Sequence, residues 1–344
     1  MLFNLEADTG DRIVCYVVPD GFQGVPRIRV CNAGEELAVL AANETRESLV
    51  VASRHETGQC GFSIDASLVP NLPSLNQLEL YDEETGILIY RRRAPHMAAR
   101  KILRLETHLF PLWRLDDALK PSFQYHARGV ESLGRETVTQ LFLLINVDSV
   151  YVSGRILYKN YAYFVESSFQ TAILLQEPYQ ELAERLLVLS KLRRIGAEIL
   201  GARESMEVEA ALEFAEQFPT EDDKAMKRAL RQMPGDVGMV FANPLTRLLT
   251  ATTPDEMPTG GAIAAALDAL SSFAVVGLRH ESDKFIGALA ELIGVEPATL
   301  PAPHQFPGVA RLAEILKTSG EVDHLLEKDL ELYHHVSQAA EKVK

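Results

Sequence analysis

The feature that most constrains the fold is a change in the spacing of apolar residues near residue 93. Before it, short apolar runs of four to eight residues alternate with segments rich in glycine, proline and acidic residues. This pattern is typical of β-strands joined by turns. After Arg91-Arg92-Arg93-Ala94-Pro95 the spacing lengthens to three or four residues, the period of amphipathic helices. We therefore predict two domains, residues 1–93 and residues 94–344.

The first domain is predicted to be a small all-β sandwich. Its apolar runs are rich in β-branched residues, as strands are, and their number fits a small antiparallel sandwich. A hairpin is expected at residues 81–86, with Gly86 at a position of positive φ. The predicted strands are 12–18, 27–33, 37–42, 48–54, 60–67, 76–82 and 86–92.

The second domain is predicted to be α/β, rich in helices and built around a short parallel sheet. Each of three short apolar runs precedes a helical pattern, which is the order found in α/β domains. The predicted strands are 149–155, 169–176 and 273–278. The predicted helices are 101–119, 135–146, 178–200, 205–218, 222–233, 262–273, 281–294, 309–319 and 321–343.

Composition limits the classes of partner. The formal net charge is −14, which opposes a broad surface for nucleic acid or anionic membranes. An anion site would need a few converging arginines. The first residues show no basic stretch followed by an apolar core, and the longest apolar run, 262–278, contains Asp268. No secretory signal and no transmembrane segment are therefore predicted, and we expect a cytoplasmic protein.

The cysteines and histidines suggest no metal site. Cys15, Cys31 and Cys60 have spacings that match neither a zinc ribbon nor a redox pair. His55 lies five residues before Cys60, and a metal site there would need both. We expect instead three reduced thiols buried in the β core.

Three stretches of the second domain resemble sulfotransferases that act on carbohydrates. Residues 243–249 and 262–295 are similar to the family's C-terminal half, with Val276-Gly277 at a strand end followed by Glu281. Residues 327–333 are similar to its closing helix, with Asp329, Leu332 and Tyr333. Residues 153–155 and 172–190 give a looser match. Together the resemblance covers roughly residues 95–340.

The resemblance implies an α/β fold and transfer of sulfate from phosphoadenosine phosphosulfate to a sugar hydroxyl. The acceptor would be a cell-surface polysaccharide or its lipid-linked precursor. The chain departs from the family in two places. It has no K-x-G-[ST]-[ST] phosphate loop, the loop in the corresponding place being 91–98. The arginine expected to hold the 3′-phosphate is replaced by Gln176, followed by Glu177.

Three hypotheses follow. The chain is an active, atypical sulfotransferase of cell-surface polysaccharide, or it has lost the cofactor and binds carbohydrate or a partner protein. The third hypothesis is a module associated with a glycosyltransferase, because Gly61–Ile64 resembles accessory domains found beside such enzymes.

Several cationic and polar residues are candidates for binding the cofactor. Arginines suit sulfate and phosphate, and polar residues that follow parallel strands lie where α/β sheets bind ligands. The alternative for the arginine run is a solvated basic edge, and for Arg185 an ion pair with Glu181. The candidates are Arg91, Arg92, Arg93, Ser153, Gly154, Arg155, Gln176 and Arg185.

Two histidines are candidates for the catalytic base, because imidazole transfers protons near neutral pH. His96 follows the arginine run, and the alternative is a surface loop histidine. His108 could line a sugar pocket with Trp113, and the alternative is helix packing on the core. Glu106 lies two residues before His108 on a predicted helix, so the two should face different sides and form no dyad.

Overall fold

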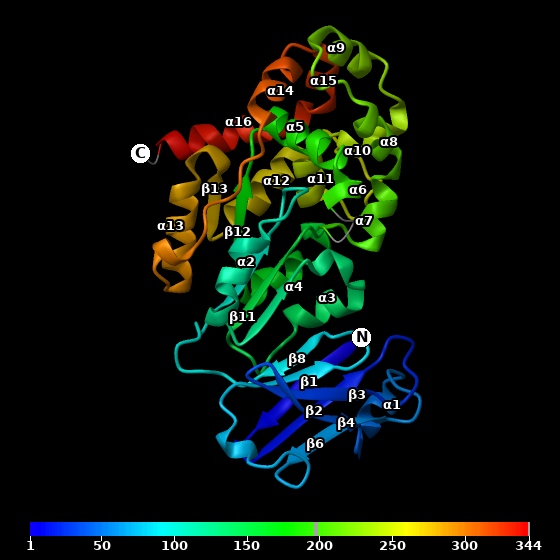
Figure 1. Ribbon diagram of the computed structural model, residues 1–344, viewed down its shortest axis with the longest axis vertical. Helices are drawn as coiled ribbons and strands as arrows, with labels where there is room; N and C mark the ends of the chain where they lie inside the picture. The colour runs from blue at the N-terminus through cyan, green and yellow to red at the C-terminus, as the bar shows by residue number, and fades with distance from the viewer. Residues whose placement is uncertain (196–198, 343–344) are drawn as a thin grey trace. The chain divides into compact units, whose positions relative to one another are not determined.

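The computed structural model describes residues 1–195 and 199–342, and the chain forms two compact units (Figure 1). The first unit comprises Met1–Ile102, Leu119–Ala127 and Leu133–Val152. The second comprises Leu103–Ala118, Arg128–Ser132 and the residues from Ser153 onward. Each unit is described by itself. The boundary after residue 93 stays a prediction.

The first unit contains two four-stranded sheets, and every strand pair with a defined register in them is antiparallel. One has the order β1 (Leu2–Asp8), β2 (Arg12–Val18), β6 (Gln59–Asp65), β5 (Glu44–Thr45). The other has the order β4 (Glu35–Ala41), β3 (Arg27–Asn32), β7 (Leu78–Asp82), β8 (Leu88–Arg91). The predicted all-β architecture is confirmed. Helix α3 (Arg135–Phe142) also belongs to this unit.

The core of the first unit follows the alternation of its strands. Ile13, Cys15 and Val17 of β2 are all completely buried, because successive side chains of a strand point to opposite faces. All three cysteines are buried free thiols, as predicted. Burial raises the pKa of the Cys15 thiol to about 12. Among residues 1–195 and 199–342, no group of three or more His, Cys, Asp or Glu side chains is placed to hold a metal.

Residues 48–54 correct the prediction for this unit, because they form no strand. They contain helix α1 (Glu47–Val51), in which the amide of Ala52 donates to the Ser48 carbonyl at 3.0 Å. Val51 is 87% exposed, so its β-branched side chain packs in no sheet. The hairpin at residues 81–86 is confirmed, and Gly86 has a φ of 69°.

The third sheet has the order β10 (Tyr125–Arg128), β11 (Val150–Gly154), β9 (Lys101–Leu105), β12 (Gln170–Leu175), β13 (Val275–Leu278). Strands β12 and β13 pair in parallel, from Ala172 opposite Val275 to Leu175 opposite Leu278. The predicted α/β architecture with a parallel sheet is confirmed. Because β11 and β12 lie on opposite sides of β9, the strand order switches there, and such sheets bind ligands at this point, outside their carboxyl ends.

Residues 101–119 correct the prediction for the helices. The single helix expected there is strand β9, a loop over residues 106–112, and helix α2 (Trp113–Leu119). Ile102, Leu103 and Leu105 are all buried, so the strand shows no alternation. A run buried on both faces cannot be distinguished from a helix by its period. Pro111 lacks an amide hydrogen and disfavours a helix that continues through it from the preceding residues. Its presence in this run was therefore a sign that 101–119 is not one helix.

The second unit contains most of the helices, and α4 and α13 contact β12 (Figure 1). The helices are α4 (Ala162–Ser168), α5 (Pro178–Leu189), α6 (Leu192–Ile195), α7 (Ala202–Glu207), α8 (Glu209–Gln217), α9 (Asp223–Arg231), α10 (Gly235–Phe241), α11 (Pro244–Thr250), α12 (Ala262–Ser271), α13 (Ser282–Ile293), α14 (Val309–Leu316), α15 (Gly320–Leu325) and α16 (Glu327–Lys342). Short 3-10 helices lie at Val130–Ser132, Tyr158–Asn160, Arg279–Glu281 and Pro297–Thr299 in this unit, and at Leu72–Ser74 and Lys120–Ser122 in the first unit.

Most predicted helices of this unit are confirmed, and the long ones at 178–200, 205–218 and 321–343 are divided. Residues 196–198 of the first and residue 343 of the last lie outside the described residues. A leucine-rich face of α5 packs on α14 and forms much of the core. No helix among the described residues is long and apolar enough to cross a bilayer.

Helices α11 and α16 cap each other. The side-chain oxygen of Asn243 accepts hydrogen bonds from the amides of Lys328 and Asp329, at 2.8 and 3.1 Å. The buried carboxylate of Asp329 accepts from the amides of Leu245 and Thr246, at 2.9 and 2.8 Å, and from the Thr246 hydroxyl at 2.6 Å. Each side chain therefore satisfies amides at the start of the other helix. Two of the stretches that resemble sulfotransferases meet here.

Candidate functional site

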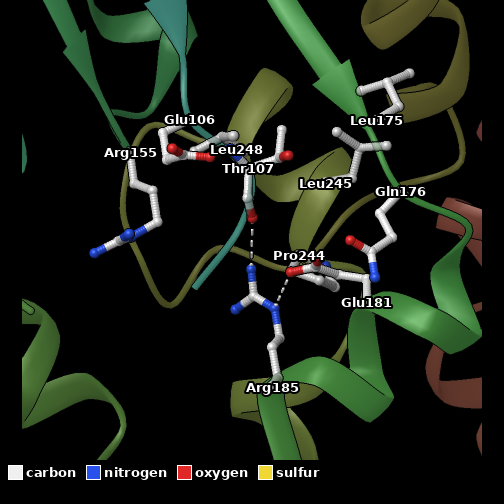
Figure 2. A pocket seen from close by; sticks show the side chains of 10 residues that line it. All are labelled: Glu106, Thr107, Arg155, Leu175, Gln176, Glu181, Arg185, Pro244, Leu245 and Leu248. Carbon is white, nitrogen blue, oxygen red and sulfur yellow. Dashed lines mark hydrogen bonds and ion pairs between the residues drawn. The ribbon is translucent and has the colours of Figure 1, made fainter. Parts of the chain in front are cut away.

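Residues at the carboxyl ends of three strands of the third sheet line one pocket of the second unit (Figure 2). Glu106 follows β9, Arg155 follows β11 and Gln176 follows β12, while Arg185 comes from α5. The other lining residues are Thr107, Leu175, Glu181, Pro244, Leu245 and Leu248. The cavity measures about 40 Å³, which holds a few water molecules at roughly 10–15 Å³ each.

The side chain of Arg155 is only 6% exposed and contacts several protein groups. Its Nε and Nη2 atoms lie 2.6 and 2.7 Å from the two carboxylate oxygens of Glu204. Nη2 also lies 3.2 Å from Glu131, and Nη1 donates to the carbonyls of His108 and Leu109. Burial alone would lower the pKa of Arg155, but the bonds and charges of Glu204 and Glu131 outweigh it and raise the pKa. Arg155 therefore acts as a structural tie.

Arg185 joins α5 to the loop after β9. Its Nε lies 2.7 Å from Glu181 Oε1, and its Nη2 donates to the Thr107 carbonyl at 3.1 Å (Figure 2). The i,i+4 ion pair expected from the sequence is thus present. The second oxygen of Glu181 and the side-chain oxygen of Gln176 are buried and accept no hydrogen bond from the described residues. The wall of the pocket therefore offers acceptors.

The carboxylate of Glu106 fills the loop that follows β9. Its Oε1 accepts from the amides of Thr107 and His108, both at 3.0 Å, and its Oε2 accepts from the amide of Leu112 at 2.8 Å. Oε2 also lies 2.9 Å from Arg104 Nη2. Burial would raise the pKa of Glu106, but Arg104 and His108 hold it well below its usual range. Amides at such a strand–loop–helix junction can bind an external anion, and here an internal one occupies them.

The same carboxylate pairs with His108, which corrects the expectation that the two residues form no dyad. His108 Nδ1 lies 2.9 Å from Glu106 Oε1, because residues 106–108 are loop and not helix. This bond fixes the ring, and in the neutral imidazole it leaves Nε2 as an acceptor. His108 Nε2 is buried and has no partner among the residues that the structure describes.

Three further side chains also carry a buried polar atom without a hydrogen-bond partner in the described chain. Together with His108 they form what we call the polar cluster. Glu184 Oε1, Arg279 Nη1 and His304 Nε2 are buried atoms without a hydrogen-bond partner in the described chain. Burial raises the pKa of Glu184, and the nearby charges of His108 and Arg279 partly offset this effect. Burial lowers the pKa of His304 to about 4, with further contributions from Arg279 and His108. The Nη2 atom of Arg279 also donates to the backbone carbonyl of His304, so these two members lie next to each other.

The sequence reasoning missed three members of the polar cluster. Glu184, Arg279 and His304 are not among the candidates that the sequence offers. Arg279 directly follows β13, just as Arg155 follows β11, so its position at a strand end was a usable signal. His304 lies in a segment without regular structure before α14, and nothing in its spacing indicates a site.

Aromatic rings flank the polar cluster, although not the one expected. The ring of His304 makes edge contacts with Phe110 and Phe306, with centroid distances of 4.6 and 4.7 Å. Trp113, a candidate for lining a sugar pocket with His108, is covered by the guanidinium of Arg128 at 4.7 Å. Phe110 and Phe306 are only partly buried, so they can contact a ligand.

The remaining candidates of the second unit, Ser153 and Gly154, are both buried. Ser153 is 1% exposed, and its hydroxyl has no partner among the described residues. Gly154 packs so closely that an added Cβ would overlap Glu131 and Val130. The glycine is therefore needed for contact within the protein.

The arginine run and His96 belong to the first unit. Arg91 is buried and lies 2.7 Å from Glu79, and Arg92 makes a two-point ion pair with Asp8 at 2.9 Å for both bonds. Arg93 and His96 are exposed. Arg91 and Arg92 thus form ion pairs within the first unit.

The chain matches no protein-family model, and no curated protein matches it significantly. The fold and the site define an α/β protein with an all-β region at its start and a buried polar site at the carboxyl end of a parallel sheet. The resemblance to carbohydrate sulfotransferases stays a hypothesis that rests on the residues quoted for it.

Proposed function

We propose that the protein binds carbohydrate on a sulfotransferase-like fold and works without phosphoadenosine phosphosulfate. One observation carries the proposal: the carboxylate of Glu106 accepts hydrogen bonds from backbone amides of the loop after β9. In the family that the sequence resembles, the loop after the first strand binds the phosphosulfate group. The sequence placed that loop at residues 91–98, but those residues follow β8 of an antiparallel sheet, and the first strand of the third sheet in chain order is β9. The loop after β9 supplies its amides to a carboxylate of the chain itself.

The residues of the pocket do not fit the nucleotide. A phosphate needs free donors and cations, but Arg155 is engaged by Glu204, Glu131 and two carbonyls. Arg185 is paired with Glu181. The ionised Glu106 would repel a phosphate, and a cavity of about 40 Å³ is far smaller than a nucleotide. We therefore derive no sulfate transfer for this chain.

The chemistry of the pocket supports contact with a single hydroxyl group of a ligand, since a cavity of about 40 Å³ is too small for a whole sugar ring. Gln176 Oε1 and Glu181 Oε2 are buried acceptors without a partner among the described residues. A sugar hydroxyl can donate to such an oxygen and accept from a neighbouring donor at the same time. The link to a cell-surface polysaccharide or its precursor comes from the resemblance alone, and so does the alternative of a protein partner.

A thermal-shift titration tests the absence of the nucleotide. Adenosine 3′,5′-bisphosphate would be added to the full chain up to millimolar concentration, and we expect no change in the unfolding temperature. An intact site at a hundredfold excess over its Kd would stabilise the fold by about 2.7 kcal/mol. A concentration-dependent shift would overturn the proposal.

A second titration tests the carbohydrate. The methyl glycosides of glucose, galactose and mannose would be titrated into the same protein, together with short oligosaccharides of each. We expect at least one to bind. If none binds at concentrations of tens of millimolar, the carbohydrate part of the proposal is wrong, whatever the nucleotide does.

A further inference from the structure

We infer that the polar cluster of His108, Glu184, Arg279 and His304 is the place where hydroxyl groups of a neutral sugar ring bind. The inference rests on the proposed function, because it takes the ligand to be a carbohydrate. Beyond the proposed function, the inference names the residues that contact the ligand and states that the ligand is uncharged.

The first step is the cost of the arrangement. A buried polar atom without a partner costs about 1–3 kcal/mol, and folded proteins leave few such atoms. The polar cluster gathers four of them from four separate segments: the loop after β9, helix α5, the turn after β13 and the segment before α14. His108 and Glu184 are 0% and 2% exposed. An arrangement so unfavourable for stability is typical of a binding site.

The second step is the mixture of donors and acceptors. Arg279 can only donate, and an ionised Glu184 can only accept. His304 is neutral near pH 7 because its pKa is about 4, so each of its nitrogens either donates or accepts. A sulfate or phosphate would face the Glu184 carboxylate, and an ammonium group would face Arg279. A hydroxyl both donates and accepts, so it suits all of them.

The third step is the surroundings of the cluster. His304 and Arg279 are partly exposed, whereas His108 and Glu184 are buried, so the cluster extends from the surface into the interior. Arg279 donates through Nη2 to the carbonyl of His304, which holds the two side by side. The rings of Phe110 and Phe306 beside His304 offer an apolar surface. Sugar rings present just such a pairing of apolar C–H faces and hydroxyl edges.

The experiment is a titration of the full chain followed by NMR of its histidine side chains. The chain contains nine histidines. The same methyl glycosides are added to protein labelled in the imidazole rings, and resonances are assigned with His108→Gln and His304→Phe variants. We expect the signals of His108 and His304 to shift on binding and that of the exposed His335 to stay unchanged.

Variants give the second readout. His304→Phe keeps a ring beside Phe110 and removes the imidazole nitrogens, and Glu184→Gln keeps the shape and removes the charge. Each should weaken sugar binding about tenfold, the loss expected for one hydrogen bond to a buried polar group. His335→Phe and Glu291→Gln alter exposed residues and should leave Kd unchanged.

The outcomes separate the two proposals. If a sugar binds while the His108 and His304 signals and both variants' Kd values stay unchanged, the polar cluster is not the site and only this inference falls. If no sugar binds, the proposed function falls and takes the inference with it. A purely structural role predicts lower unfolding temperatures for both variants with unchanged Kd, and that result also overturns the inference.

Discussion

The guanidinium of Arg104 and the carboxylate of Asp116 form a two-point ion pair inside the second unit, with Nε–Oδ1 and Nη2–Oδ2 distances of 2.9 and 2.8 Å. Arg104 and Asp116 are 2% and 0% exposed. The same guanidinium lies 2.9 Å from the Glu106 carboxylate. Arg104 therefore ties helix α2 to the carboxylate that fills the loop after β9.

Replacing Asp116 by Asn should lower the free energy of unfolding by about 3 kcal/mol, because it replaces one of the two carboxylates that neutralise a buried guanidinium by a neutral amide. Urea unfolding followed by circular dichroism measures the change. The neighbouring Asp117 gives a matched control, since it pairs with Arg128 at the surface and is 55% exposed. Asp117→Asn should cost less than about 1 kcal/mol. Equal effects of the two substitutions would contradict the assignment.

Glu106→Gln tests the carboxylate in the loop. The amide side chain keeps one acceptor but brings a donor to face backbone amides, so we expect a loss of about 3 kcal/mol or more at pH 7. Because the folded-state pKa of Glu106 is lowered, its stabilisation is present above pH 4.5 and is lost as pH falls below that value. The variant should lack this part of the acid sensitivity. Urea unfolding at pH 7 and pH 4 would show a wild-type profile if the assignment is wrong.

His304 should make stability depend on pH in a different window. Its pKa falls from the ordinary 6.5 to about 4 on folding, by burial first and then by the charges of Arg279 and His108. The unfolded state therefore binds more protons between these values, and stability rises as pH increases from 4 to 6.5. His304→Phe should flatten this slope, measured as urea midpoints at pH 5 and pH 7. If the dependence of stability on pH is unchanged in the variant, a group other than His304 is responsible for it.

Glu184→Gln should stabilise the protein. Burial raises the pKa of Glu184, so its ionised form costs stability as pH rises above 4.5, and a neutral amide avoids that cost. We expect a gain of about 1 kcal/mol at pH 7, measured by urea unfolding beside the exposed Glu291→Gln, which should change nothing. A loss of stability would mean that Glu184 has a firm partner in the fold.

The reciprocal caps of α11 and α16 should behave as one unit. Asp329→Ala removes the acceptor of three hydrogen bonds and should cost about 1–3 kcal/mol. Asn243→Ala should cost about 1 kcal/mol or more. Because both side chains join the same two helices, the double variant should cost less than the sum of the single ones. Additive losses in chemical denaturation would show that the two caps act independently.

Much of the fold could be predicted from local patterns. The strands of the first unit alternate in a way that Ile13, Cys15 and Val17 illustrate, and the helices of the second unit have long apolar faces. The meeting of Arg155 and Gln176 in one pocket also followed, because residues after parallel strands share one edge of the sheet.

The rest depended on contacts that spacing does not reveal. Strand β9 is buried on both faces, so its run merged with α2 into an apparent helix, and the dyad of Glu106 and His108 disappeared with it. Val50 and Val51 suggested a strand, but they lie in α1, and no strand in the described part of the chain pairs with them. His304 reaches the polar cluster through a segment without periodicity, and only tertiary structure places it there.

The position of Glu106 has a consequence for how this loop could ever recognise a free anion. A carboxylate attached to the loop competes at an effective concentration that no dissolved phosphate or sulfate can match, because it cannot diffuse away. Acquiring an anion ligand would thus require a change of sequence at residue 106 before any change of shape. The Glu106 side chain keeps the backbone amides of the loop occupied by a group of the protein itself.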